Sequence, residues 1–162
     1  GWANLSNAPF RMYKRYTHEG GVATPLIVHW PAGVKAKGAL RHDPSHLIDI
    51  APTCLAAAGL EGGGMEGKIL LPVFAKNQKK ERTLFWEHEG NRAVRKGDYK
   101  LVAMHNTPWE LYDMSKDRSE LKNLASFMPK KTAELRNDWE AWAKRIGAMP
   151  WDEVNVKKKK KK

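Results

Sequence analysis

Cysteine is almost absent from this sequence: of 162 residues, only Cys54 is a cysteine. A single thiol excludes an intrachain disulfide and a cysteine-based metal site. Long apolar runs are absent too, and none approaches the roughly 18 residues that a membrane-spanning helix needs. The stretch from Gly1 to Asn4 has neither the basic start nor the apolar block of a signal peptide. Because the chain does not begin with Met, we expect it to start inside a longer protein.

A basic stripe is also missing, although the net charge is +11. Six of these charges lie in the terminal run 157–162, and such blocks usually form solvated tails. We therefore expect residues 151–162 to form a disordered lysine tail. The other basic residues alternate with acids and lack an aromatic stacking platform, so no specific nucleic-acid partner is expected. A non-catalytic interaction module driven by the tail remains an alternative, and it predicts binding that falls steeply with salt.

Hydrophobic residues make up 41% and charged residues 29%, which is typical of a soluble globular protein. The most informative stretch is Lys14 to Gly21, which places a lysine shortly before the pair Gly20-Gly21. The apolar run Thr24 to Trp30 follows and predicts a buried strand of a larger sheet. A lysine in this position can present its charge to an anion at the edge of a rigid scaffold.

The chain then changes character at a connector. A helix is predicted over Ile50 to Ala58, because Pro52 is tolerated in a first turn and Gly59 is a natural C-terminal stop. The glycine-rich stretch 62–77 reads as a flexible connector. We place the domain boundary at its end, which gives domains 1–78 and 79–150.

The second domain has the pattern of a small antiparallel sheet. Short runs separated by turns with Gly-Asn and Gly-Asp pairs predict four strands, at Thr83 to His88, Arg92 to Arg95, Tyr99 to Ala103 and Glu110 to Asp113. A helix is predicted to begin at Pro129. Its apolar residues lie on one face of the helix, which is expected to pack against other parts of the chain. They are Leu135, Trp139, Trp142 and Ile146. We expect this helix to pack on the four-stranded sheet.

The Lys14 to Gly21 stretch resembles the formylglycine-dependent sulfatases (arylsulfatases). The same resemblance continues, in order, through 45–59, 86–95, 97–102, 109–113 and 117–124, and it covers Trp2 to about Pro150. It implies an α/β fold, in which the last elements of an alkaline-phosphatase-like α/β core precede a four-stranded antiparallel sheet with one packed helix. It also implies a periplasmic or secreted location.

Proteins of this family hydrolyse sulfate esters with a formylglycine made from Cys or Ser. The resemblance therefore implies a small-molecule or carbohydrate sulfate ester as substrate, and calcium held by acidic residues and an Asn. Lysine and histidine side chains of the family bind sulfate oxygens, where they neutralise the charge that develops as sulfur is attacked.

Only one residue of this chain matches a family catalytic position, and a second is a candidate for contact with substrate. Lys14 matches a family catalytic position and would bind a sulfate oxygen, although spacing alone also fits an exposed loop lysine. His88, at the first turn of the C-terminal sheet, would contact substrate, or would be a packed strand-end histidine. His18 could act as an acid or base in a cleft, but no partner is evident, and we interpret it as a hydrogen-bonded loop histidine. We interpret Glu19 as a structural group that caps or bonds backbone at the Gly-Gly turn. The spacing of His42 with His46 suggests a metal pair, but no third ligand is near.

The sequence departs from the family at its nucleophile. The formylglycine signature needs Cys or Ser, then Pro or a small residue two positions on and Arg four positions on. Cys54 is followed by Leu55-Ala56-Ala57-Ala58, so it fails this pattern and reads as helix core. The aspartates that hold calcium are missing as well. We expect the chain alone to be inactive and its Leu26-Ile27-Val28 edge to be prone to association. Phosphodiesterases and phosphonate hydrolases of the same fold remain alternatives for the parent protein.

Overall fold

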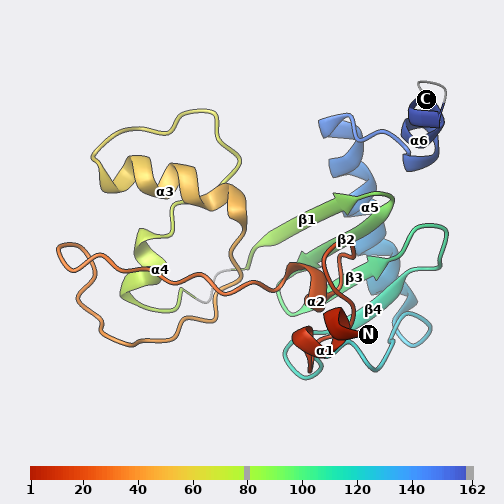
Figure 1. Ribbon diagram of the computed structural model, residues 1–162, viewed down its shortest axis with the longest axis horizontal. Helices are drawn as coiled ribbons and strands as arrows, with labels where there is room; N and C mark the ends of the chain where they lie inside the picture. Colours follow the sequence, from red (N-terminus) through yellow and green to blue (C-terminus); the bar gives the residue numbers. More distant parts are fainter. Residues whose placement is uncertain (79–80, 160–162) are drawn as a thin grey trace. The chain divides into compact units, whose positions relative to one another are not determined.

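The structure is a computed structural model that describes residues 1–78 and 81–159 (Figure 1). It contains two compact units. One combines residues 1–24 with the chain from Thr83 onward, and the other comprises Pro25–Arg82. No helix in the described part of the chain combines the length and apolar character needed to cross a bilayer.

The first unit is built on an antiparallel meander with strand order β1-β2-β3-β4. Its strands are β1 (Thr83–His88), β2 (Asn91–Lys96), β3 (Tyr99–Ala103) and β4 (Glu110–Asp113). Glu89 and Gly90 join β1 to β2 with φ angles of 52° and 81°. Two successive positive φ angles are typical of the turn that matches strand twist in a tight hairpin. The predicted strands and their hairpin turns are thus confirmed.

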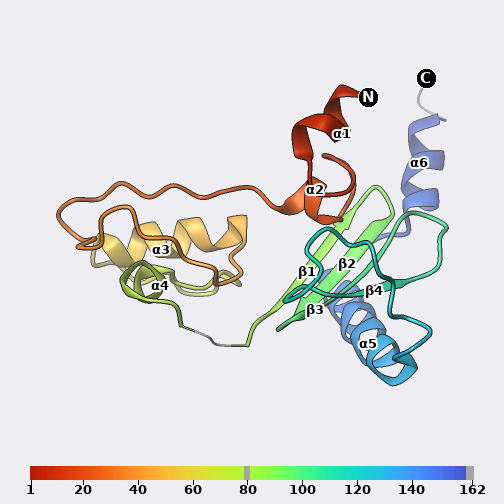
Figure 2. The ribbon, with the colours of Figure 1, turned by 90° about the horizontal axis from the view of Figure 1, so that it is seen from below.

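One face of the sheet is covered by α5 (Pro129–Ile146), as predicted (Figure 2). A fully buried cluster joins one residue of the helix to three strands, and consists of Val94, Leu101, Leu111 and Leu135. The Trp139 indole N–H donates to the Trp86 carbonyl at 3.0 Å, which fixes the helix along β1. The helix ends at Gly147, whose φ of 68° is the left-handed conformation of a helix C-terminus.

The opposite face is covered by the N-terminal segment, which contains α1 (Trp2–Asn7) and α2 (Glu19–Val22) (Figure 2). Side chains alternate along β3, so Lys100 and Val102 lie on this face while Leu101 points to α5. A second apolar cluster is buried here, made of Ala93, Val102, Tyr112 and Met114. The sheet is therefore buried on both faces.

The second unit contains η1 (Leu47–Asp49), α3 (Ile50–Ala57) and α4 (Leu71–Ala75). The helix predicted over Ile50 to Ala58 is confirmed. The fully buried Asp49 carboxylate accepts two hydrogen bonds from the Arg82 guanidinium, at 2.5 and 2.6 Å. It also accepts the backbone N–H of Lys68. Asp49 therefore ties the beginning of α3 both to Lys68 and to Arg82, the last residue of the unit.

The predicted buried strand at Thr24 to Trp30 is wrong for this chain. The segment is extended but pairs with no described strand, and Leu26, Ile27 and Val28 are 51%, 89% and 39% exposed. A strand exists only when its backbone groups bond a neighbour. The prediction that Cys54 is buried is wrong too, because its side chain is exposed and α3 buries only Pro52 and Thr53.

The structure also differs from the prediction of disorder at two places. The glycine-rich connector contains α4. The expected tail contains α6 (Trp151–Lys159), which has Asp152 and Glu153 in its first turn, where acidic side chains favour a helix. Residues 160–162 lie outside the described residues. The boundary between domains 1–78 and 79–150 stays a prediction, although residues 1–24 cluster with the sheet rather than with Pro25–Arg82.

Candidate functional site

Lys14 lies on the loop between α1 and α2, and its side chain is exposed. Among the described residues, none forms a hydrogen bond or ion pair with its ammonium. The backbone around it is unusual, because Met12 has a φ of 65° and Arg15 a φ of 101°. Residues other than glycine rarely adopt such backbone angles unless the surrounding structure holds them there. The loop therefore presents a free ammonium from a firmly held backbone.

Gly20 and Gly21 allow this loop to fold back tightly. A Cβ atom on Gly20 would collide with the carbonyl oxygens of Arg11 and Met12, and one on Gly21 with that of Tyr16. The Gly20 N–H instead donates to the Arg11 carbonyl at 2.9 Å. Glycine is needed here for close backbone approach, and this gives the Gly-Gly pair its structural role.

The Lys14 loop is bonded to the β1–β2 turn, which directly follows His88, the last residue of β1. Arg15 Nε lies 2.7 Å from Glu89 Oε2. The buried Asn91 amide donates both to the Arg15 carbonyl, at 3.1 Å, and to the His88 carbonyl, at 2.9 Å. The structure thus brings the loops of the two predicted site residues to the same end of the sheet. Their roles in binding stay predictions.

A hollow of about 360 Å³ lies beside His88, whose own side chain is exposed. Its lining combines two carboxylates, an imidazole, an indole and two apolar side chains, from Glu87, His88, Glu89, Met149, Trp151 and Val154. A few polar groups among apolar and aromatic ones are typical of small-molecule sites. The sequence did not indicate Trp151, because α6 was expected to be disordered.

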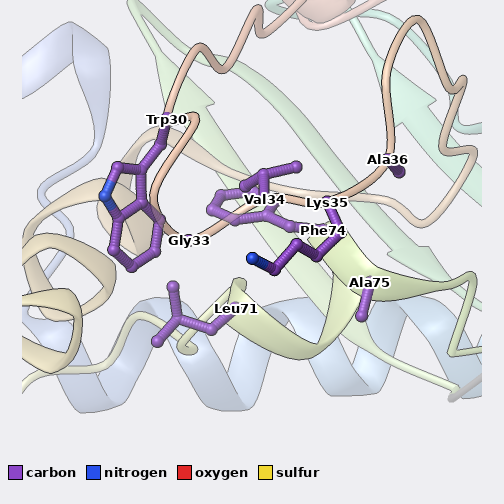
Figure 3. A pocket seen from close by; sticks show the side chains of 8 residues that line it. All are labelled: Trp30, Gly33, Val34, Lys35, Ala36, Leu71, Phe74 and Ala75. Carbon is purple, nitrogen blue, oxygen red and sulfur yellow. The ribbon is translucent and has the colours of Figure 1, made fainter.

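The second unit has a pocket of its own, of about 540 Å³, for which the sequence predicted no role (Figure 3). Figure 3 shows the rings of Trp30 and Phe74 among its walls. Lys35 is its one charged side chain, and the other lining residues are apolar or glycine: Gly33, Val34, Ala36, Leu71 and Ala75.

Glu19, immediately before the glycine pair, belongs to a buried network of charges. Its Oε1 lies 3.1 Å from the Lys100 ammonium, and its Oε2 accepts a 2.8 Å hydrogen bond from Arg118. Burial by itself would raise the pKa of Glu19, but Lys100 and Arg118 outweigh burial and hold that pKa below its usual value. Glu19 is thus a structural group, but its carboxylate bonds two cations from distant segments rather than the backbone at the Gly-Gly turn.

His18 is buried and bonded, as expected for a structural histidine. Its Nε2 lies 3.2 Å from Glu110 Oε2, which also accepts the Tyr112 hydroxyl at 2.8 Å. Burial lowers the pKa of His18, and the negative charges of Glu120 and Glu110 offset this only in part. Burial and the bond to Glu110 also raise the pKa of Tyr112, so its hydroxyl stays protonated.

The two other histidines of interest do not form a metal site. His46 Nδ1 accepts the Ile48 N–H at 3.3 Å and so caps η1, and His42 is exposed. Within residues 1–78 and 81–159, no group of three or more His, Cys, Asp or Glu side chains could hold a metal ion. The described residues therefore do not fit a calcium site.

Comparison with known proteins gives the family. Residues 10–144 match the family model described as "N-sulphoglucosamine sulphohydrolase, C-terminal". An uncharacterised sulfatase of Schizosaccharomyces pombe is 32% identical over 91% of this chain and 30% of its own length. The N-acetylgalactosamine-6-sulfatase of Mus musculus is 34% identical over 69% of the chain and 22% of its own length.

A solved structure shows the same architecture. The crystal structure of Ps i-CgsB in complex with k-i-k-neocarrahexaose has a TM-score of 0.73 and 25% identity, and the match covers 86% of this chain and 34% of that one. The chain belongs to the sulfatase family and corresponds to its C-terminal portion. Its relatives are sulfuric ester hydrolases, and it spans less than a third of the length of the two curated relatives above. The predicted family and fold class are confirmed.

Proposed function

We propose that this chain is part of a sulfatase and that Lys14 binds a sulfate oxygen of the substrate. The observation that carries this proposal is the free ammonium of Lys14, displayed on a loop whose backbone is held in strained conformations. The family model also matches across this loop. When a sulfate ester is cleaved, negative charge grows on its oxygens, and a positioned cation stabilises that charge more than a mobile one.

The substrate of this sulfatase is a carbohydrate sulfate ester, with His88 as a contact. Support comes from the hollow beside His88, whose Trp151 ring offers an apolar surface and whose Glu87 and Glu89 carboxylates can accept hydroxyl hydrogens. Relatives point the same way by name: one is an N-acetylgalactosamine-6-sulfatase and another an N-acetylglucosamine-6-O-sulfatase of Bacteroides thetaiotaomicron.

The nucleophile and the metal come from outside this chain in our proposal. Cys54 lacks the formylglycine signature, and the described residues do not fit calcium. In this proposal the chain by itself is inactive. A periplasmic or secreted location is also part of the proposal, and it rests on the family resemblance alone.

The test is Lys14→Ala in the protein that contains the upstream region, with 4-nitrophenyl sulfate and a sulfated monosaccharide as substrates. We expect kcat/KM to fall about 10²–10³-fold, as when one transition-state donor is removed. Lys122→Ala, at another exposed lysine, is the matched control and should change little. Full activity of Lys14→Ala would contradict the role of Lys14. Preference for bis(4-nitrophenyl) phosphate over the sulfate would instead favour the phosphodiesterase alternative.

A further inference from the structure

Lys100 is an ammonium buried in the middle of a sheet. It lies on β3, on the face covered by residues 1–24, and its side chain is fully shielded from water. Its Nζ lies 3.1 Å from Glu19 Oε1 and 2.9 Å from Glu120 Oε1. A buried charge is tolerated only when partners compensate for its lost hydration. Lys100 therefore holds together two carboxylates that come from segments 101 positions apart.

Glu120 in turn bonds both ends of the Lys14 loop. Its Oε2 accepts the backbone N–H of Glu19 at 2.8 Å, after the loop. Its backbone carbonyl accepts a 2.5 Å hydrogen bond from Nη1 of Arg11, which comes before the loop. Glu120 itself has a φ of 55°, in the left-handed region that residues other than glycine rarely adopt. Residues 12–18, with Lys14 among them, are thus closed at both ends by one residue.

The charges of this arrangement balance. Three carboxylates face three cations, namely Glu19, Glu110 and Glu120 with Arg11, Lys100 and Arg118. Arg118 also lies over the Phe10 ring, 4.9 Å from its centre, so the network extends to the residue before Arg11. The pairs join four separate stretches of sequence, namely residues 10–19, β3, β4 and residues 118–120.

We propose that Lys100 and Glu120 are positioning residues for Lys14: the buried Lys100 ammonium orients Glu120, and Glu120 clamps both ends of the loop that presents Lys14. This inference rests on the proposed function only for its effect on catalysis. The clamp itself is a property of this chain and is tested separately.

The first experiment is limited trypsin digestion of the 162-residue chain, with cleavage sites identified by mass spectrometry. Trypsin cuts after Lys14 and Arg15 in the loop and after Arg92 in β2, so each digest carries its own internal reference. In Glu120→Gln and Lys100→Met we expect cleavage after Lys14 and Arg15 to rise about tenfold relative to cleavage after Arg92, because the loop opens locally.

Lys96→Met is the matched control. Lys96 also pairs with two carboxylates, Glu134 and Asp138, each at 3.0 Å, but these lie on α5 across the other face of the sheet. Its loss should leave the loop-to-sheet cleavage ratio unchanged. Glu120→Gln keeps shape and one carbonyl acceptor, so it tests the clamp even if Lys100→Met fails to fold. An unchanged ratio in Glu120→Gln overturns the proposal.

The second experiment places Lys14→Ala and Glu120→Gln, singly and together, in the protein with its upstream region. If Glu120 acts only through Lys14, Glu120→Gln should lower kcat/KM in the wild-type background. In the Lys14→Ala background it should lower kcat/KM by less than a further twofold. Equal losses in both backgrounds overturn the positioning role. If Lys14→Ala is fully active, the proposed function fails while the trypsin result on the clamp still stands.

Discussion

Arg15, with its φ of 101°, shows at the scale of one residue how the Lys14 loop is held. Such an angle costs conformational energy that other contacts must offset. Those contacts include the Arg15–Glu89 ion pair at 2.7 Å and the tight approach of Gly20 and Gly21 to the loop carbonyls. The backbone is too close to Gly20 and Gly21 for a side chain at either position. The loop cannot move away from the sheet without breaking the Arg15–Glu89 ion pair.

Gly21→Ala should therefore destabilise the chain. The added Cβ atom would overlap the Tyr16 carbonyl oxygen, and overpacking of this kind typically costs about 1–3 kcal/mol. Urea unfolding followed by circular dichroism gives the free energy of unfolding. Gly63→Ala is the control, because nothing lies within 4 Å of a Cβ atom there, and it should stay within about 0.5 kcal/mol of wild type. Equal effects of the two substitutions would contradict the close-approach argument.

His18 should make stability depend on pH. Its pKa in the folded chain lies below the unfolded value of 6.5, so the unfolded chain binds more protons below that pH. The free energy of unfolding should fall as pH drops from about 6.5 through the folded pKa, by at most about 1.4 kcal/mol per pH unit. Glu110, Glu120 and Lys100 are the charges that act on the imidazole.

The measurement is the free energy of unfolding at pH 7.0, 6.0 and 5.0 for wild type and His18→Gln. The variant should lose stability less steeply, although the pKa of His46, also lowered by burial, leaves a residual slope in both. His42→Gln changes an exposed histidine and should follow wild type. Parallel curves for wild type and His18→Gln would show that His18 does not titrate in this range.

At the scale of elements, the structure separates what local pattern predicts from what it cannot. The β1–β4 meander, α3 and α5 follow from alternation, turn glycines and helical spacing, and all three predictions hold. The prediction of a buried strand at Thr24 to Trp30 failed because a strand needs a neighbouring strand to pair with. The periodicity of a segment does not show whether such a neighbour exists. The short helices α1, α2 and α4 were missed because helices of this length carry little periodic signal.

The candidate site was predictable only in part. Lys14 and His88 came from the family resemblance, but the clamp behind them joins residues about 80 to 100 positions apart, which no local pattern reveals. One signal was available. Lys100 lies two positions from Val102 in an apolar strand, so alternation places a charge on a buried face. That charge had to have buried partners.

Leu135→Ala tests the contact between α5 and the sheet. Leu135 is fully buried against Val94, Leu101 and Leu111, and removing such a side chain typically costs about 2–5 kcal/mol. Leu121→Ala makes the same chemical change at a side chain that is 77% exposed and should cost little. Chemical denaturation of both variants gives the difference. A loss at Leu135 no greater than at Leu121 would mean that α5 contributes little to the stability of the unit.

At the scale of the whole molecule, the extended segment around Leu26, Ile27 and Val28 presents apolar side chains and unpaired backbone. Exposed edges of this kind promote association between chains. We expect the 162-residue chain to self-associate in a concentration-dependent way, and Ile27→Lys to reduce that association. Sedimentation velocity over a range of concentrations measures it. Leu121→Lys, at another exposed leucine, is the control, and equal behaviour of both variants would exclude this segment as the contact.

The clamp of Glu120 around the Lys14 loop also sets an order of events during synthesis. Residues 1–24 leave the ribosome before their anchors, Lys100 and Glu120, have been made. The meander can form from neighbouring hairpins, whereas the N-terminal segment must close a long loop before it gains any contact with the sheet. The loop that carries Lys14 is thus translated before the residues that clamp it, and it reaches its bonded position only after they have been made.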